Sequence, residues 1–353
     1  MAERVRTEFL HAWNNYERYA WGHDALKPLS KTHHDWYGQS LLMTPVDALD
    51  TLILMKLDAE ADKARALITS DLSFDRDIYV KNFEITIRLL GGLLSGYQLT
   101  GDRRLLGLAE DLGNRLLPAF NSPTGMPYVF VNLRTGQVRD PVSNPAETGT
   151  LLLEFGTLSK LIGKPVFYEK AKRALVETYK RRSPLGLVGS SINVETGAWT
   201  DNDSHISGGI DSYYEYLWKC WLLFGDKDCL EMWNLHGIEP EVIDYKTMGI
   251  IAKTYHLRPE IVESTYYLYH YTKEQQYRQM GETIFNDFVK YCRTEAGYAA
   301  LSDVITKEKR DEMESFALAE TFKYFYLLFA KPGTLDFDKV VFNTEAHRLR
   351  RTW

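Results

Sequence analysis

The chain has 353 residues, a formal net charge of -6 and an apolar share of 44%. This much apolar surface excludes intrinsic disorder, and no apolar run approaches the roughly 18 residues that a membrane helix needs. The mild acidity argues against a nucleic-acid partner, because such proteins usually carry a basic face. Three cysteines are too few for a disulfide scaffold, and their spacing fits no zinc motif.

The N-terminal segment is amphipathic and contains Trp13, Tyr16 and Trp21. Its start shows no basic stretch followed by an apolar one, which would indicate a secretory signal. We therefore expect a protein that either stays in the cytoplasm or has lost a leader, and the sequence leaves its localisation unknown.

Five later segments share one layout: an acid near the start, apolar residues at helical spacing, and a polar or glycine stop. They begin at Glu84, Glu147, Asp211, Glu260 and Glu314, and they stop near residues 102, 164, 226, 274 and 331. The stops define a degenerate internal period, longer than that of the common solenoid repeats. Because these segments are apolar nearly all round, they are predicted to be buried helices.

More polar helices alternate with the buried ones. Residues 104–117 and 166–179 each have one apolar stripe and one charged face, as helices on the solvent side do. Together with residues 46–52 and the helix after them, the pattern predicts about six helical hairpins. A ring of such hairpins is an (α/α) barrel, and a solenoid is the alternative. The barrel is favoured because the acids share one end of every inner helix, and a barrel brings those ends to one pocket.

Strand character is predicted only at the end of the chain, where Val340, Val341 and Phe342 are β-branched or aromatic. The whole chain, residues 1–353, is predicted to be a single domain.

The acids at the helix starts could simply complement the helix dipole and cap free N–H groups. As a set they are harder to explain, because buried carboxylates are rare unless they are paired or functional. The set comprises Glu84, Glu147, Asp211, Glu215, Glu260, Glu263 and Glu320. Arg88 and Arg258 lie close to two of these acids in sequence, where they can keep a carboxylate ionised or bind sugar hydroxyls.

An aromatic-lined pocket with several carboxylates suits glycoside hydrolysis. One carboxylic acid protonates the leaving oxygen, and a second activates water or attacks the anomeric carbon. The pattern alone therefore predicts a carbohydrate-active (α/α) barrel, although several lyases and isomerases share this outline.

Particular strings along the chain are more specific. In chain order they are 19–24 (YAWGHD), 46–52 (VDALDTL), 83–94 (FEITIRLLGGLL), 116–120 (LLPAF), 124–128 (TGMPY), 146–147 (AE), 153–155 (LEF), 211–217 (DSYYEYL), 257–260 (LRPE), 263–264 (ES), 313–316 (MESF), 319–321 (AET) and 342–347 (FNTEAH). Together they resemble glycoside hydrolase family 47, the class I α-1,2-mannosidases, in the family's order over nearly the whole chain. Any one string is a weak signal, and the series is a strong one.

The resemblance implies an all-α fold, an (α/α)7 barrel of alternating inner and outer helices, with a short C-terminal β segment that plugs the barrel. Residues 8–21 would then supply the helix that the count of hairpins lacks. It also implies an inverting, calcium-dependent exo-α-1,2-mannosidase. The expected substrate is a terminal α-1,2-linked mannose of an oligosaccharide or glycan, and the expected cofactor is Ca²⁺. Thr344 matches the residue that binds this ion directly.

The resemblance also assigns roles residue by residue. Glu84, Asp211 and Glu260 match the catalytic carboxylates. Glu260 is expected to be the base that activates water, and the acid is either Glu84, acting through a water, or Asp211. An inverting enzyme holds its acid and base roughly 6.5–9.5 Å apart. The candidate residues for binding the sugar or the waters of the ion are Arg88, Glu147, Glu215, Arg258, Glu263, Phe316, Glu320 and Glu345, with Phe316 matching an aromatic that packs on the sugar face.

The chain departs from the family in three places. Residues 233–255 lack the string Asp-His-Leu-x-Cys-Phe that often precedes Arg-Pro-Glu, so part of the barrel wall or cleft is expected to be reduced. The family's structural cysteine pair is missing, which weakens a secretory-pathway assignment. Gly209 stands where some members have an arginine that selects one glycan branch, so looser branch selectivity or a different aglycone is expected. These departures suggest a short or bacterial-type member.

Two other functions stay open on the sequence. One is a catalytically weak mannose-glycan-binding protein on the same fold, and the other is a helical repeat scaffold without a small-molecule site. The presence of Glu84, Asp211, Glu260 and Thr344 together argues against the first, because a pure binder need not keep all four.

Overall fold

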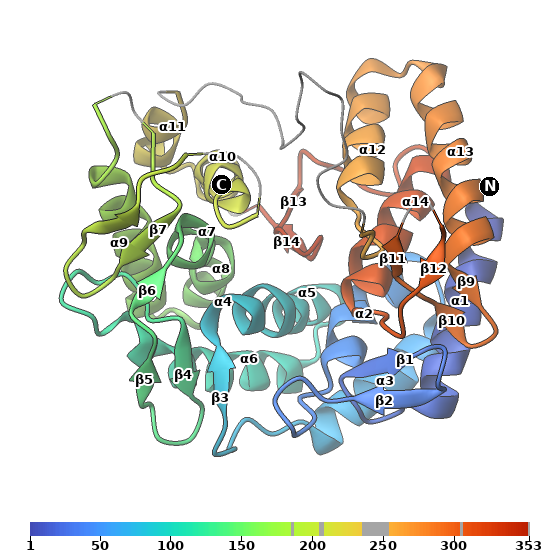
Figure 1. Ribbon diagram of the computed structural model, residues 1–353, viewed down its shortest axis with the longest axis horizontal. Coiled ribbons are helices and arrows are strands. Elements are labelled where there is room, and N and C mark those ends of the chain that lie inside the picture. The colour runs from blue at the N-terminus through green and yellow to red at the C-terminus, as the bar shows by residue number, and fades with distance from the viewer. Residues whose placement is uncertain (185–186, 205–207, 235–253, 304–305, 352–353) are drawn as a thin grey trace. The chain divides into compact units, whose positions relative to one another are not determined.

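The computed structural model describes residues 1–184, 187–204, 208–234, 254–303 and 306–351 (Figure 1). The chain divides into two compact units. The first unit comprises Met1–Leu72 and Asp244–Asp336, and the second comprises Ser73–Ile243 and Phe337–Trp353. Among the residues described, no helix combines the length and the apolar character needed to cross a bilayer.

The first unit is built from helical hairpins. Its helices are α1 (Ala2–Tyr19), α2 (Met43–Leu54), α3 (Asp58–Asp71), α12 (Glu260–Thr272), α13 (Gln275–Cys292), the π-helical segment η3 (Ala317–Thr321) and α14 (Phe322–Phe329). Helix α2 pairs with α3, α12 pairs with α13, and α14 packs against both α1 and α12. Aromatic rings fill the space between them, with Phe9 edge-on to Phe322 at 5.7 Å between centroids.

The second unit repeats the same hairpin. Its helices are α4 (Asn82–Ile85), the π-helical segment η1 (Thr86–Leu90), α5 (Gly91–Thr100), α6 (Arg103–Leu116), η2 (Leu117–Phe120), α7 (Pro145–Gly149), α8 (Leu152–Ile162), α9 (Val166–Lys180), α10 (Asp211–Phe224) and α11 (Lys227–Asn234). The hairpins are α5–α6, α8–α9 and α10–α11. Gly101, Gly163 and Gly225 end the first helix of each hairpin in a left-handed conformation, so the predicted stops are confirmed.

A disulfide joins Cys220 on α10 to Cys229 on α11, with 6.1 Å between their Cα atoms. The spacing of the cysteines did not predict this bond. It closes the hairpin that begins with Asp211, so α10 and α11 are linked covalently as well as by packing.

Short strands connect the helices. They are β1 (Ala25–Lys27), β2 (Thr32–His34), β3 (Tyr79–Lys81), β4 (Phe130–Asn132), β5 (Val138–Arg139), β6 (Val142–Ser143), β7 (Ser191–Asn193), β8 (Trp199–Asp201), β9 (Arg293–Thr294), β10 (Gly297–Tyr298), β11 (Leu301–Asp303), β12 (Glu308–Lys309), β13 (Val340–Phe342) and β14 (Arg348–Arg350). They pair antiparallel, in the orders β3-β4-β5 and β6-β7-β8 and as hairpins elsewhere in the described chain. The prediction of strand only at β13 is wrong, because strands of two or three residues are too short to show an alternating pattern.

Two inner helices differ from their predicted form. The helix expected from Glu314 begins only at Ala317, because Met313 is still held in an antiparallel bridge with Leu26. Helix α12 has the predicted bounds but is not buried all round. Its residues Ile261, Leu268 and Tyr271 are exposed, Tyr271 by 71%.

A buried ion pair crosses the first unit. Lys323 Nζ on α14 lies 2.8 Å from Asp50 Oδ1 on α2, and both side chains are fully buried. Burying two charges costs solvation free energy, which their mutual attraction offsets only while both partners are present. The pair therefore fixes how α2 and α14 pack within this unit.

We predict that Lys323→Met lowers the free energy of unfolding by about 3–5 kcal/mol, because it leaves the Asp50 carboxylate buried without its cation. Lys180→Met is the matched control, since the ion pair of Lys180 with Glu177 is exposed and should contribute within about 1 kcal/mol. Adding Asp50→Leu to Lys323→Met should recover at least half of the loss. Urea titrations measure all three, and a loss for Lys323→Met no larger than the control's would contradict the prediction.

Candidate active site

A buried arginine organises one part of the candidate site, in the second unit. Arg88 lies in η1, one turn after Glu84, and its Nε and Nη2 atoms lie 3.1 Å and 3.0 Å from Glu84 Oε2. Its Nη1 atom donates to Glu345 Oε1. Arg88 is 8% exposed and Glu345 is 2% exposed. The guanidinium therefore joins the start of the α4–α5 helix to the C-terminal hairpin and forms ion pairs with two carboxylates at once.

The turn between β13 and β14 is fixed by Asn343. Its Oδ1 atom accepts hydrogen bonds from the backbone N–H groups of Glu345, at 3.0 Å, and His347, at 2.7 Å. Its Nδ2 atom donates to the Ile87 carbonyl at 2.9 Å. The turn packs so closely on α5 that a Cβ atom at Gly91 would lie 2.6 Å from Asn343 Nδ2. Only glycine at this position lets the turn seat against the helix.

Thr344 lies at the centre of this turn. Its hydroxyl donates to Glu215 Oε2 at 2.9 Å, and its backbone N–H donates to Tyr216 Oη at 3.3 Å. The hydroxyl oxygen donates its proton to Glu215, so its lone pairs can face a metal ion. The other possible metal ligands around it are hydroxyl and carboxylate oxygens. Oxygen donors of this kind suit a hard cation such as Ca²⁺, so the donor set fits the ion that the sequence predicts.

Helix α10 carries the predicted acids Asp211 and Glu215 on successive turns. Glu215 is half-buried and forms an ion pair with Lys219, one turn further along the helix. Asp211 accepts the Ser212 N–H at 2.8 Å and is exposed. Lys219 was missed in the sequence analysis, although its spacing of four residues from Glu215 is a usable signal.

Glu147 occupies a separate position at the start of α7. It is 8% exposed, and its carboxylate lies 2.6 Å from Lys81 Nζ and accepts from Ser143 Oγ at 3.1 Å. The neighbouring Ala146 donates its N–H to the Gly209 carbonyl at 2.8 Å. Gly209 has φ of +97°, a conformation in which any side chain is strained. An arginine at this position would therefore need a different backbone.

Other predicted residues lie in the first unit. Arg258 Nη1 is 3.7 Å from Glu260 Oε1, and the Arg258 guanidinium lies 5.9 Å from the ring centroid of Phe316, which is buried. The side chains of Arg258 and Glu260 are about half exposed, at 56% and 51%. This cation over an aromatic face presents a mixed polar and apolar surface.

The expectation that the acids are buried holds for only part of the set. Glu147 and Glu320 are buried, whereas Asp211 and Glu260 are exposed. Asp211 and Glu260 are the first residues of α10 and α12. The side chain of a first residue projects past the end of its helix, so it does not enter the face that packs against neighbouring helices.

Two carboxylates lie deeper in the first unit. Glu263, one turn into α12, accepts from Tyr324 Oη at 2.7 Å. Glu320 is 6% exposed and lies in η3. The two π-helical segments thus carry Arg88 and Glu320, and π-helical turns are often found at functional sites. Tyr324 was missed because nothing in its sequence position separates it from a core aromatic.

A third residue to which the sequence analysis assigned no role is Glu154, in the interior of α8. Its side chain is fully buried, and its Oε1 atom accepts from Tyr216 Oη at 2.5 Å and from Asn343 Nδ2 at 2.9 Å. Burial raises the pKa of Glu154 to about 7, although both hydrogen bonds act in the opposite direction. A carboxylate inside an otherwise apolar run was the available sequence signal.

We predict that Glu154→Gln removes a pH dependence of stability. In the folded protein the Glu154 carboxyl keeps its proton up to about pH 7, whereas in the unfolded chain it loses it near 4.5. The free energy of unfolding should therefore fall by about 3 kcal/mol as the pH rises through this window, and the amide should not show this loss.

Urea titrations in calcium-free buffer at several pH values test this. The difference between Glu154→Gln and wild type should grow in favour of the variant as the pH rises. Glu177→Gln is the control with the opposite sign, because Arg181 and Lys180 lower the pKa of Glu177. A difference for Glu154→Gln that does not change with pH would contradict the prediction.

The sequence of the chain matches the profile of a known family over almost its whole length. The family profile for glycosyl hydrolase family 47 matches residues 8–239 and 229–351. The two matched ranges overlap at residues 229–239, close to the stretch 233–255 that lacks the family's Asp-His-Leu string. Residues 235–253 lie outside those described. The profile therefore matches the chain in two parts that divide close to the missing string.

Individual proteins agree with this assignment. The chain is 33% identical to Alpha-mannosidase I MNS5 of Arabidopsis thaliana, covering 99% of this chain and 77% of the relative. It is 34% identical to Mannosyl-oligosaccharide 1,2-alpha-mannosidase MNS1 of the same plant, covering 99% and 78%. Among solved structures it is similar to an alpha-1,2-mannosidase from Trichoderma reesei, with a TM-score of 0.90, 25% identity and 99% of both chains covered.

These likenesses confirm the predicted all-α (α/α)7 barrel fold. They also confirm the resemblance that the sequence strings indicate. The chain belongs to glycosyl hydrolase family 47.

Proposed function

We propose that this glycoside hydrolase is a calcium-dependent, inverting exo-α-1,2-mannosidase that removes terminal α-1,2-linked mannose from mannosides or high-mannose glycans. Family membership and the names of the similar proteins support the sugar and the linkage. The observation that carries the proposal is the pair of ion pairs that Arg88 forms with Glu84 and Glu345. Through them, one buried guanidinium holds both a candidate acid and the turn that contains Thr344.

The roles of the carboxylates follow from inverting hydrolysis, in which one group activates water and another protonates the leaving oxygen. Glu260 is proposed as the base. Its exposed carboxylate at the first residue of α12 can receive a water, and the Arg258 guanidinium lies 3.7 Å away. Glu84 is proposed as the acid, acting through a water, with Asp211 as the alternative.

Thr344 would hold the calcium ion directly, through its hydroxyl and its backbone carbonyl. Carboxylates such as Glu215 and Glu345 would hold the waters that complete the shell, as outer partners do at other metal sites. When bound, the ion would orient sugar hydroxyls and polarise the waters beside them. The residues of this chain provide the fixed turn that keeps Thr344 in place.

The remaining residues are proposed to bind the terminal mannose. Phe316 would pack on the sugar face, with Arg258 above the ring, because sugars present C–H groups that suit an aromatic surface. The others in this set are Arg88, Glu147, Glu263 and Glu320. Gly209 contributes no side chain beside Glu147, so we propose that glycan branches are selected loosely.

We predict that the protein hydrolyses α-1,2-mannobiose and that β-mannose is the first product, because a water attacks from the face opposite the leaving group. Proton NMR during the first turnovers distinguishes the anomers, and a chelator should abolish the reaction, which Ca²⁺ then restores. Release of α-mannose first would overturn the inverting mechanism. Binding of mannosides without turnover would instead favour a glycan-binding protein on the same fold.

We predict that Glu260→Gln lowers kcat by roughly 10²–10⁴-fold, because the amide cannot accept a proton from the attacking water. Binding of the sugar, measured by calorimetry, should remain, since Gln is nearly isosteric. Glu282→Gln, at an exposed position of α13, is the matched control and should retain wild-type kcat. A near-wild-type rate for Glu260→Gln would show that another group is the base.

A further inference from the structure

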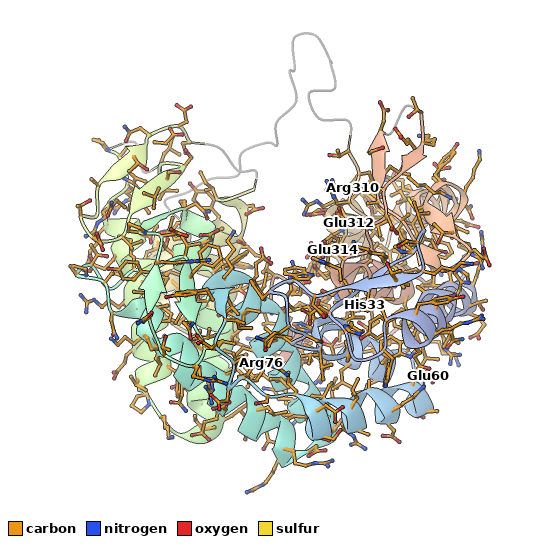
Figure 2. The ribbon with its side chains drawn as sticks, turned by 60° about the horizontal axis from the view of Figure 1, so that its bottom comes forward. His33, Glu60, Arg76, Arg310, Glu312 and Glu314 are labelled. Atoms are coloured by element: carbon orange, nitrogen blue, oxygen red, sulfur yellow. A yellow bond between two sulfur atoms is a disulfide. The ribbon has the colours of Figure 1, made fainter. Side chains whose placement is uncertain are left out.

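A cluster of metal-ligating side chains lies between α1 and α2, apart from the residues that the proposed function uses. His23 Nδ1 is 3.0 Å from Asp35 Oδ2, and the rings of His23 and His33 are stacked with 3.4 Å between centroids. One ligand atom from each of the three side chains lies within 4.8 Å of the others. Figure 2 labels His33 on the small sheet formed by β1 and β2.

The backbone that carries His23 and Asp35 is held by a reciprocal pair of hydrogen bonds. The Asp24 N–H donates to Asp35 Oδ1 at 3.0 Å, and the Trp36 N–H donates to Asp24 Oδ2 at 3.1 Å. Asp24 is buried and also accepts the Leu41 N–H at 2.7 Å. Residues 23–24 and 35–36 are therefore clamped together.

His33 is placed by a second, independent constraint. It pairs across the β1–β2 hairpin with Leu26, whose side chain is fully buried. A slip of this register by one residue would turn Leu26 out of the core, so the register is strongly fixed. All three side chains thus start from backbone positions that are fixed by other interactions, which is the condition for a preorganised site.

The donor chemistry selects a class of ion. Two imidazole nitrogens and one carboxylate oxygen suit Zn²⁺ and similar borderline ions, which take such ligands in tetrahedral sites with a water in the fourth position. The His23 side chain is 35% exposed and His33 is exposed, so solvent can supply that water. The rings are stacked at 13° to one another, so one of them would have to turn about its Cβ–Cγ bond before both imidazoles could bind the same ion. That turn is open to an exposed histidine.

We propose that His23, His33 and Asp35 form a zinc-binding site in the loop that joins α1 to α2. Zinc held there would link the segment after α1 to β2 and stabilise the folded first unit, because an ion that binds only the folded state raises its stability. This inference does not depend on the proposed mannosidase function, and it is tested without an activity measurement.

The test is calorimetric titration of the full chain with ZnCl₂ in buffer with excess Ca²⁺, so that sites preferring a hard ion are already filled. We expect one zinc per chain, with a higher melting temperature when zinc is present. His23→Ala, His33→Ala and Asp35→Asn should each weaken binding by about tenfold or more. Asp35→Asn keeps an oxygen for the Asp24 N–H, so the loop should still fold.

His34→Ala is the matched control. His34 follows His33 on β2, and successive side chains of a strand point to opposite faces, so this variant should bind zinc like wild type. Co²⁺ in place of Zn²⁺ should give visible absorption bands that His33→Ala loses. A wild type without stoichiometric zinc binding, or an effect of His34→Ala as large as that of His33→Ala, would overturn the proposal.

Discussion

The buried Arg88 guanidinium is the interaction on which the candidate site depends. It holds the Glu84 carboxylate from its own helix and the Glu345 carboxylate from a segment 257 residues further along the chain. Two carboxylates close together repel one another unless a cation lies between them or one of them is protonated. The position of the proposed acid and the position of the turn that carries Thr344 are therefore set by the same charge.

A second, mostly neutral network also supports the turn. Glu154 accepts from Tyr216 and Asn343, and these two residues in turn bind the backbone of the turn at Thr344, Glu345 and His347. A buried carboxyl with a raised pKa adds less charge to a site that already holds several carboxylates. Arg88 balances charge, whereas Glu154 supplies hydrogen bonds, and the turn needs both.

Local signals in the sequence were sufficient for the helices of the fold. The stops at Gly101, Gly163 and Gly225 are read correctly because a left-handed C-terminal residue is a local requirement. The short strands, the π-helical turns and the disulfide between Cys220 and Cys229 leave no comparable pattern. The contact of Arg88 with Glu345 depends on tertiary packing, which residue spacing does not encode. Resemblance to the family identified both residues as candidates, but not that they bind each other.

The chain carries two donor sets of different chemical hardness, and this difference would keep two ions apart. The surroundings of Thr344 offer hydroxyl and carboxylate oxygens, which suit an ion of high coordination number such as calcium. The loop after α1 offers two imidazoles and a single carboxylate, too few oxygens for calcium but a sufficient set for zinc. Selectivity would then rest on the type and number of donors at each place. Calcium and zinc could then be present together, and each would still bind at the site whose ligands suit it.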